Sequence, residues 1–96
     1  MIEVTVQIFF SFGRKLEGDG NGVTLELMVD STVYDAISKL TDLYPGLSGE
    51  ILQDSGELRR FIQVRLNQVG VEHLSGLETE LNEKDDLLIL PKLGGG

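Results

Sequence analysis

The chain has 96 residues, of which 41% are hydrophobic and 25% charged, a composition typical of one ordinary globular domain. Its net charge of −8 argues against a direct nucleic-acid partner and favours a protein partner with a basic surface. The sequence has no cysteine, which excludes disulfides, thiol catalysis and thiolate-bound metals and fits a reducing compartment. No apolar run approaches the roughly 20 residues that span a bilayer, so we expect a cytoplasmic protein without a membrane partner.

The N-terminal segment predicts a β-hairpin. Residues 2–10 alternate between two faces, and the apolar face holds Ile2, Val4, Val6, Ile8 and Phe10. Residues 22–29 repeat the alternation, with Val23, Leu25, Leu27 and Val29 expected to point inward. The glycine-rich stretch FGRKLEGDGNG between them suits a turn. Its acids lack the closing glutamate of a calcium loop, so we expect no metal site there.

A single helix is predicted over residues 32–44. Its apolar positions recur at spacings of three and four, which places one face inward: Val33, Ala36, Ile37, Leu40, Leu43 and Tyr44. Thr32 or Ser31 can cap the first turn with Asp35 in a capping box, and Pro45-Gly46 ends the helix. In the following loop, one helical turn is expected at residues 50–53.

Two further strands are predicted after this loop. Residues 60–67 alternate, with Ile62, Val64 and Leu66 on one face and Phe61, Gln63 and Arg65 on the other. The run LLILP, residues 87–91, is almost wholly apolar, which indicates a central strand beside residues 2–10. The order β-β-α-β-β predicts an α+β fold, a mixed sheet of four to five strands with the helix across one face. We expect Val33, Ile37 and Leu40 to pack against Val4, Val6 and Leu88.

Two phenylalanines are candidates for a binding surface. Alternation places Phe9 and Phe61 opposite the predicted core face. If their strands are neighbours, they form one patch with part of Leu87 or Ile89, and such patches often mark partner sites. Single exposed apolar residues are also common on ordinary surfaces, so both interpretations stay open. His73 is the only histidine and has no partner group for metal binding or catalysis nearby in the sequence.

The two ends of the chain resemble the MoaD/ThiS family of ubiquitin-like sulfur carriers. The stretch VTVQIFFSFGRKLEG resembles the opening of molybdopterin synthase small subunits, and LETELNEKDDLLILPKLGGG is similar to their closing pattern. Aligned from Leu81 and Pro91, the family's terminal glycine pair falls on Gly95 and Gly96. The resemblance implies a β-grasp domain over residues 1–91 and a flexible reactive tail over residues 92–96.

Three positions depart from the pattern of this family. Lys84 stands where a glycine is frequent, Asn67-Gln68 where Asn-Gly is frequent, and Lys92 where a second proline is frequent. The family resemblance is therefore stronger than any assignment to one pathway.

The resemblance also implies a chemistry. A ubiquitin-activating-type adenylyltransferase, MoeB-like, would use ATP and Mg²⁺ to adenylate the carboxylate of Gly96, and the chain itself would bind no cofactor. Gly95 would leave space beside the reacting carbonyl, and the partner would contact the rest of the tail and its root: Pro91, Lys92, Leu93 and Gly94. Sulfur transfer would then give a thiocarboxylate.

Several functions stay open at this point. One alternative is transfer of the sulfur to the large subunit of molybdopterin synthase, and another is tRNA thiolation. A third alternative is the formation of isopeptide bonds between the activated tail and protein lysines. In each case the chain has no catalytic centre of its own. The remaining alternative is a non-catalytic interaction domain with an inert tail.

Overall fold

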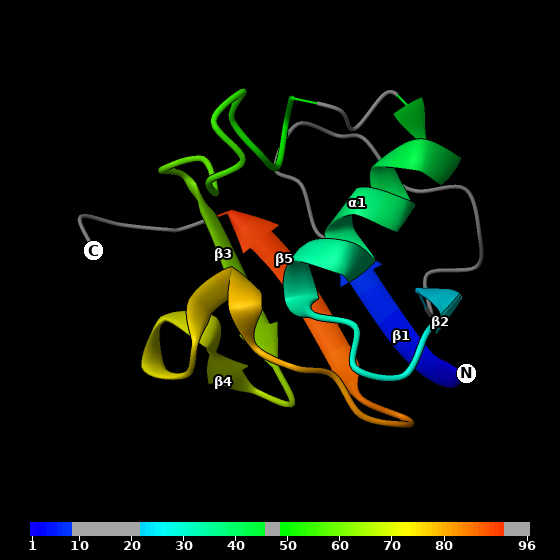
Figure 1. Ribbon diagram of the computed structural model, residues 1–96. Coiled ribbons are helices and arrows are strands. Elements are labelled where there is room, and N and C mark those ends of the chain that lie inside the picture. Colours follow the sequence, from blue (N-terminus) through cyan, green and yellow to red (C-terminus); the bar gives the residue numbers. More distant parts are fainter. Residues whose placement is uncertain (9–21, 46–48, 92–96) are drawn as a thin grey trace.

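The fold is a five-stranded mixed sheet with a helix across one face (Figure 1). The computed structural model describes residues 1–8, 22–45 and 49–91. Its strands are β1 (Ile2–Ile8), β2 (Val23–Leu27), β3 (Ile62–Leu66), β4 (Val69–Gly70) and β5 (Asp86–Pro91). They lie in the order β2-β1-β5-β3-β4, with β5 parallel to β1 and antiparallel to β3. The predicted central position of the last strand, beside the first, is confirmed.

The N-terminal hairpin forms as predicted, but its second strand is shorter. β1 and β2 pair antiparallel with Val4 opposite Leu25. The inward residues of both strands are buried except for Ile8 and Val23, which are half-buried and pack against the core. Val29 was expected to point inward, and this is wrong because it is 63% exposed. β2 ends at Leu27, and the chain then turns: the Ser31 N–H donates to the Met28 carbonyl, and Asp30 has a φ of 73°. The predicted turn, Phe9 and Phe10 lie in residues 9–21, outside the described part of the chain.

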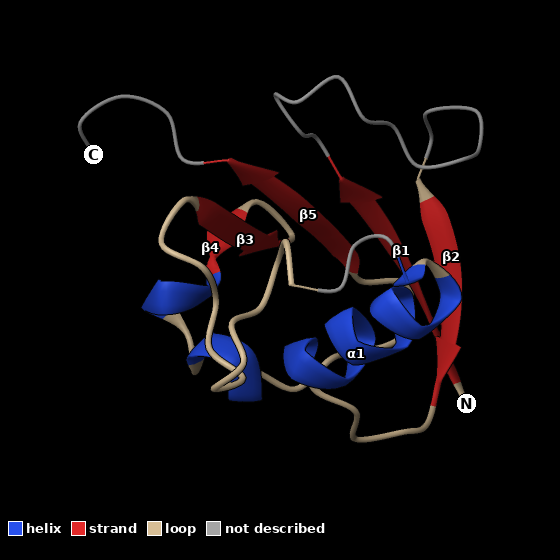
Figure 2. Cartoon of the chain, turned by 90° about the horizontal axis from the view of Figure 1, so that it is seen from above, coloured by secondary structure: helices blue, strands red, loops and turns tan. Residues whose placement is uncertain are grey.

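Helix α1 (Val33–Leu43) covers one face of the sheet (Figure 2). Thr32 is its N-cap, and a capping box joins the side chains and N–H groups of Thr32 and Asp35, as predicted. Four of the expected inward residues are buried, namely Val33, Ala36, Ile37 and Leu40. Leu43 is an exception, because it is 54% exposed in the last turn, where Tyr44 packs against the core instead.

The expected contact of the helix with Leu88 is wrong. Leu88 pairs with Gln7 of β1 and Arg65 of β3, both of which lie on the face away from the core. Leu87 and Ile89 are the fully buried residues of β5 and take part in the core with Val4 and Val6. The sequence LLIL is apolar on both faces and so carries no alternation from which the inward residues can be identified.

The helical turn expected at residues 50–53 is also wrong. Leu52 forms an isolated antiparallel bridge with Leu58, and the Gln53 N–H donates to the Glu57 carbonyl at 2.7 Å. Gly56 has a φ of 91°, which permits the tight reversal between them. This local pairing holds Ile51 in the core, where it is fully buried.

The stretch between β3 and β5 is more ordered than the sequence indicated. It contains β4 and two short 3-10 helices, η2 (Val71–His73) and η3 (Gly76–Glu78). These helices lie with the 51–61 loop over the β3 side of the sheet, beside α1 (Figures 1 and 2). The Val33 N–H donates to the Thr79 carbonyl at 2.9 Å, which joins the start of α1 to the chain after η3.

A buried carboxylate fixes the start of β5. Asp85 is 8% exposed, and its two oxygens accept hydrogen bonds from the Asn67 side-chain amide at 3.0 Å and the Asn82 N–H at 2.7 Å. The side-chain oxygen of Asn67 in turn accepts from the Asp86 N–H at 2.9 Å. These bonds tie the β3–β4 turn to β5 and so position the strand that leads to the tail.

We predict that Asp85→Ala lowers the free energy of unfolding by about 1–3 kcal/mol, because two donors lose a part-buried acceptor. Asp86→Ala is the matched control, since the exposed Asp86 side chain lies outside these bonds and its backbone still binds Asn67. Urea unfolding of both variants measures the difference. Equal stability of the two variants would contradict a structural role for the Asp85 carboxylate.

The β3–β4 turn, where Asn67-Gln68 departs from the family pattern, offers a site for a stabilising substitution. Gln68 has a φ of 75°, a conformation that is unfavourable for a residue with a Cβ atom. Gln68→Gly should therefore raise the free energy of unfolding by about 0.5–1 kcal/mol, the strain relief outweighing the extra freedom of the unfolded chain. Gln68→Ala keeps the Cβ atom and should give no such gain. A melting temperature raised equally by both variants would contradict this explanation.

Candidate functional site

The predicted reactive tail begins at the end of the central strand. β5 ends at Pro91, which pairs with Ile62 at the start of β3. The candidate residues Lys92, Leu93, Gly94, Gly95 and Gly96 follow directly, and they lie outside the described part of the chain. The structure therefore places the root of the tail but not its reactive end.

The outward face of the sheet beside this root is partly apolar. Leu88 and Leu90 of β5 are half-buried and point away from the core. Their cross-strand neighbours are polar: Gln7 and Arg65 lie opposite Leu88, and Gln63 lies opposite Leu90. Sequence reasoning missed Leu88 and Leu90 as surface residues, and the alternation of the neighbouring strand β3 was the signal that could have found them.

The predicted patch of Phe9 and Phe61 with Leu87 or Ile89 needs correction. Strands β1 and β3 are not neighbours, because β5 lies between them. Leu87 and Ile89 are core residues and contribute no outward surface. Phe9 lies outside the described residues.

Phe61 remains a candidate for partner binding. Its side chain is 76% exposed, and it immediately precedes Ile62, the residue paired with Pro91. The structure thus brings Phe61 next to the root of the tail. A large, exposed aromatic residue at such a place is typical of a contact surface. The contact itself stays a prediction.

The other sequence candidates form no catalytic arrangement within residues 1–8, 22–45 and 49–91. His73 is exposed, and its Nε2 lies 3.7 Å from a carboxylate oxygen of Glu72. In these ranges, no group of three or more histidine and acidic side chains is arranged to hold a metal ion. None of the helices there has the length and apolar character to cross a membrane.

Comparison with known proteins identifies the class. The family model described as the ThiS family matches residues 8–96, and the chain belongs to this family. It is a ubiquitin-like protein of the sulfur carrier and small modifier type. The family predicted from the two ends of the sequence is confirmed.

Three relatives cover nearly the whole chain. Small archaeal modifier protein 3 of Haloferax volcanii is 32% identical over 88 residues, which are 92% of this chain and 94% of that protein. The solution structure of small archaeal modifier protein 1 from Methanosarcina acetivorans has a TM-score of 0.75 at 30% identity, covering 100% of this chain and 98% of that one. The crystal structure of the Amycolatopsis orientalis BexX/CysO complex matches with a TM-score of 0.74 at 30% identity, covering 97% and 99%. The ubiquitin-like β-grasp fold is thereby confirmed.

We predict that Phe61→Asp weakens the complex with an activating enzyme at least tenfold, while the free energy of unfolding changes by no more than about 0.5 kcal/mol. The side chain is exposed, so its loss removes contact area from a partner and little from the core. Val29→Asp is the control, since Val29 is also an exposed apolar residue but lies in the β2–α1 turn. Calorimetric titration measures binding. Equal affinity of both variants would show that Phe61 lies outside the interface.

Proposed function

We propose that the chain is a sulfur carrier whose Gly96 carboxylate is adenylated by a ubiquitin-activating-type partner and then converted to a thiocarboxylate. The observation that carries this proposal is the position of the tail. The glycine-rich segment directly follows a central strand of a ubiquitin-like sheet, and the family match extends through Gly96. The names of the relatives, which include sulfur carrier protein CysO, support the same chemistry.

The length of the tail suits insertion into an enzyme. Residues 92–96 can extend about 16–18 Å beyond Pro91, at 3.3–3.6 Å per residue. The folded body can therefore remain at the surface of a partner while the carboxylate reaches a site within it. The glycines at 94–96 add no side chains to the tail. The tail can therefore enter a narrow channel of the partner with an extended backbone at the reacting carbonyl.

The proposed reaction has three steps. A carboxylate oxygen of Gly96 attacks the α-phosphorus of ATP, and pyrophosphate leaves. The terminal sulfur of a persulfide then attacks the carbonyl carbon, and AMP leaves with the bonding electron pair. A second thiol cleaves the resulting acyl disulfide, which releases the thiocarboxylate and forms a disulfide with the former persulfide sulfur. Both thiols belong to partner proteins, because this chain contains no cysteine. In the proposed reaction, the activating partner binds ATP and Mg²⁺.

The outward sheet face is the proposed contact for the activating enzyme. Phe61 lies at the root of the tail, and Leu88 and Leu90 provide apolar area along β5. Arg65 and the glutamines beside them add polar contacts that can fix orientation. A MoeB-like adenylyltransferase is the partner that this arrangement and the family best support.

A second candidate function uses the same activated tail. The 32% identical relative that spans 92% of this chain is named a small archaeal modifier protein. Attack of a lysine amine on the adenylated Gly96 would form an isopeptide bond and release AMP, so the chain would act as a protein modifier. Molybdopterin synthesis and tRNA thiolation are two destinations for the sulfur if the carrier reaction prevails.

Deletion of Gly95 and Gly96, or addition of one residue after Gly96, should abolish ATP–pyrophosphate exchange by the matching activating enzyme. Thermal stability should be retained, because a short terminal segment beyond the last strand contributes little to folding. Gly95→Val should be nearly as damaging through crowding beside the reactive carbonyl, whereas Gly94→Ala serves as the tolerated control. Full exchange by the deleted chain would mean that the tail is inert.

Intact mass of the protein isolated from its own cells distinguishes the two candidates and identifies the natural C-terminus. The mass gain of one oxygen replaced by sulfur marks the thiocarboxylate. A diglycine remnant on lysines of other proteins after proteolysis marks conjugation.

A further inference from the structure

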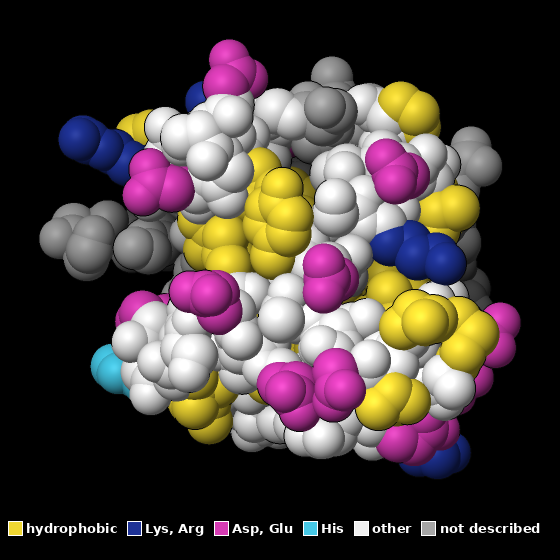
Figure 3. Space-filling model, viewed as in Figure 1, with side chains coloured by type: hydrophobic (Ala, Val, Ile, Leu, Met, Phe, Trp, Pro, Cys, Tyr) yellow, Lys and Arg dark blue, Asp and Glu magenta, His cyan; other side chains and the backbone are white. Residues whose placement is uncertain are grey.

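An apolar groove lies on the helix side of the sheet, away from the outward face. Figure 3 shows this side, where hydrophobic side chains are visible in a hollow bounded by acidic side chains. The groove has a volume of about 460 Å³ and lies between the 57–59 loop and the two 3-10 helices. This volume falls within the range of about 300–1,000 Å³ that is usual for ligand sites in proteins.

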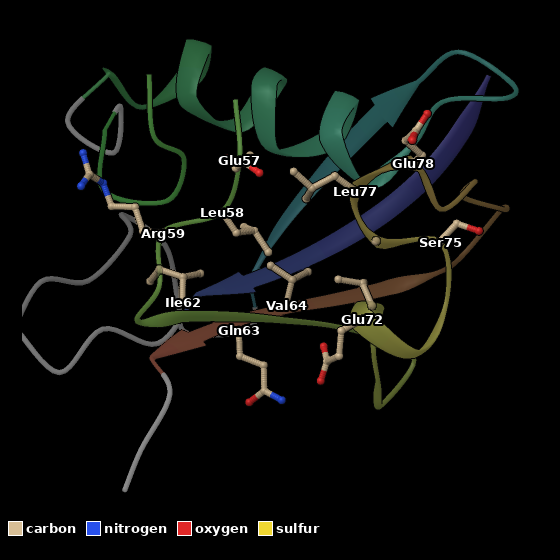
Figure 4. Close-up of a pocket in the computed structure, with 12 residues that line it drawn as sticks. Glu57, Leu58, Arg59, Ile62, Gln63, Val64, Glu72, Ser75, Leu77 and Glu78 are labelled. Carbon is tan, nitrogen blue, oxygen red and sulfur yellow. The ribbon is translucent and has the colours of Figure 1, made fainter. Parts of the chain in front are cut away.

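The inner surface of the groove is aliphatic. Ile62 and Val64 of β3 form its floor and are buried, while Leu58 from the loop and Leu77 from η3 form opposite walls and are half-buried. Figure 4 shows these four side chains pointing toward one another. Because both walls retain exposed apolar area, an added aliphatic side chain between them would bury surface of Leu58 and Leu77 while resting on the aliphatic floor.

The rim of the groove is acidic on both walls. Glu57 directly precedes Leu58 of one wall, Glu78 directly follows Leu77 of the other, and both glutamates are exposed. The Glu57 carboxylate accepts a hydrogen bond from the Ser55 hydroxyl at 3.2 Å. The cation at the end of the groove, Arg59, has its Nε–H bound to the Gly49 carbonyl. Glu72 and Gln63 also belong to the lining, but their side chains point to the other side of β3 (Figure 4).

We propose that this groove is a second docking site, which binds a short segment of a partner protein carrying one or two large aliphatic side chains flanked by lysine or arginine. The aliphatic floor and walls select the apolar side chains, and the glutamates on both walls select the flanking cations. The net charge of −8 favours approach of the same kind of partner.

The position of the groove makes it independent of the proposed activation surface. The groove opens on the helix side, whereas Leu88, Leu90 and Arg65 face the opposite side of the sheet. At one end, Ile62 is both part of the floor and the backbone partner of Pro91. A segment bound in the groove is thus held close to the root of the tail without covering the outward face. The proposal does not depend on the chemistry of the tail.

Chemical-shift mapping on the full-length ¹⁵N-labelled chain tests the proposal with three peptides. The first peptide has two leucines between Lys-Arg pairs, the second has the same leucines between Glu-Asp pairs, and the third has serines between the Lys-Arg pairs. We expect saturable shifts of the amides of Leu58, Ile62, Val64 and Leu77 with the first peptide only. Shifts centred on Arg65 and Leu88, equal responses to the first and third peptides, or no response to the first would overturn the proposal.

Charge-reversal variants separate local recognition from net charge. Glu57→Lys combined with Glu78→Lys should weaken binding of the first peptide about tenfold, as expected for loss of two favourable charge contacts. Glu26→Lys combined with Asp42→Lys makes the same change in net charge at exposed positions on β2 and α1, away from the groove. If both pairs of substitutions weakened binding of the first peptide equally, long-range attraction to the net charge would explain the loss. That result would contradict a specific site in the groove.

A chain that lacks residues 92–96 tests whether the tail itself occupies the groove. The proposal requires that this chain bind the first peptide with the same affinity as the full-length chain. Markedly tighter binding after truncation would make the tail the occupant and overturn the assignment to a partner segment.

Discussion

The pairing of β5 between β1 and β3 is the constraint on which the rest of the structure depends. It joins the first and last strands, with Ile8 opposite Ile89, and it joins the last strand to β3, with Ile62 opposite Pro91. The turn before β5 is also held to the first strand, since the Lys84 N–H donates to the Glu3 carbonyl and the Glu3 N–H to the Glu83 carboxylate. Because β5 has a partner on both edges, the chain that leaves the sheet at Pro91 leaves it from a central strand.

The alternation of side chains along β5 separates core residues from residues of the proposed contact surface. Leu87 and Ile89 pack with the residues under α1, while Leu88 and Leu90 face outward beside Gln63 and Arg65. A shift of register by one residue would exchange these two sets. The hydrogen bonds of the Asn67 side chain with Asp85 and with the Asp86 N–H lie at the start of the strand and help to hold it at this register. They therefore support both the core and the outward surface.

The parts that could be predicted from the sequence are those in which local pattern and tertiary environment agree. The alternation in β1 and β3 and the Thr32–Asp35 capping box each depend on neighbouring residues, and the structure confirms them. The inward residues of β5 could not be predicted from LLIL, because all four residues are apolar. Ile51 is held in place by a bridge between Leu52 and Leu58, and no hydrophobic periodicity in the sequence predicts this bridge. The groove could not be predicted from the sequence either, because its residues Leu58, Val64 and Leu77 come from a loop, a strand and a 3-10 helix that only the fold brings together.

The two faces of β3 belong to the two surfaces that we propose for partner binding. Gln63 and Arg65 belong to the outward face, whereas Ile62 and Val64 form the floor of the groove. One strand thus contributes to two surfaces on opposite sides of the sheet, and both lie next to the root of the tail through the pairing of Ile62 with Pro91. A partner on one side leaves the other side open, because the sheet itself stands between them. The same central pairing that stabilises the fold therefore brings two surfaces on opposite sides of the sheet to the root of the tail.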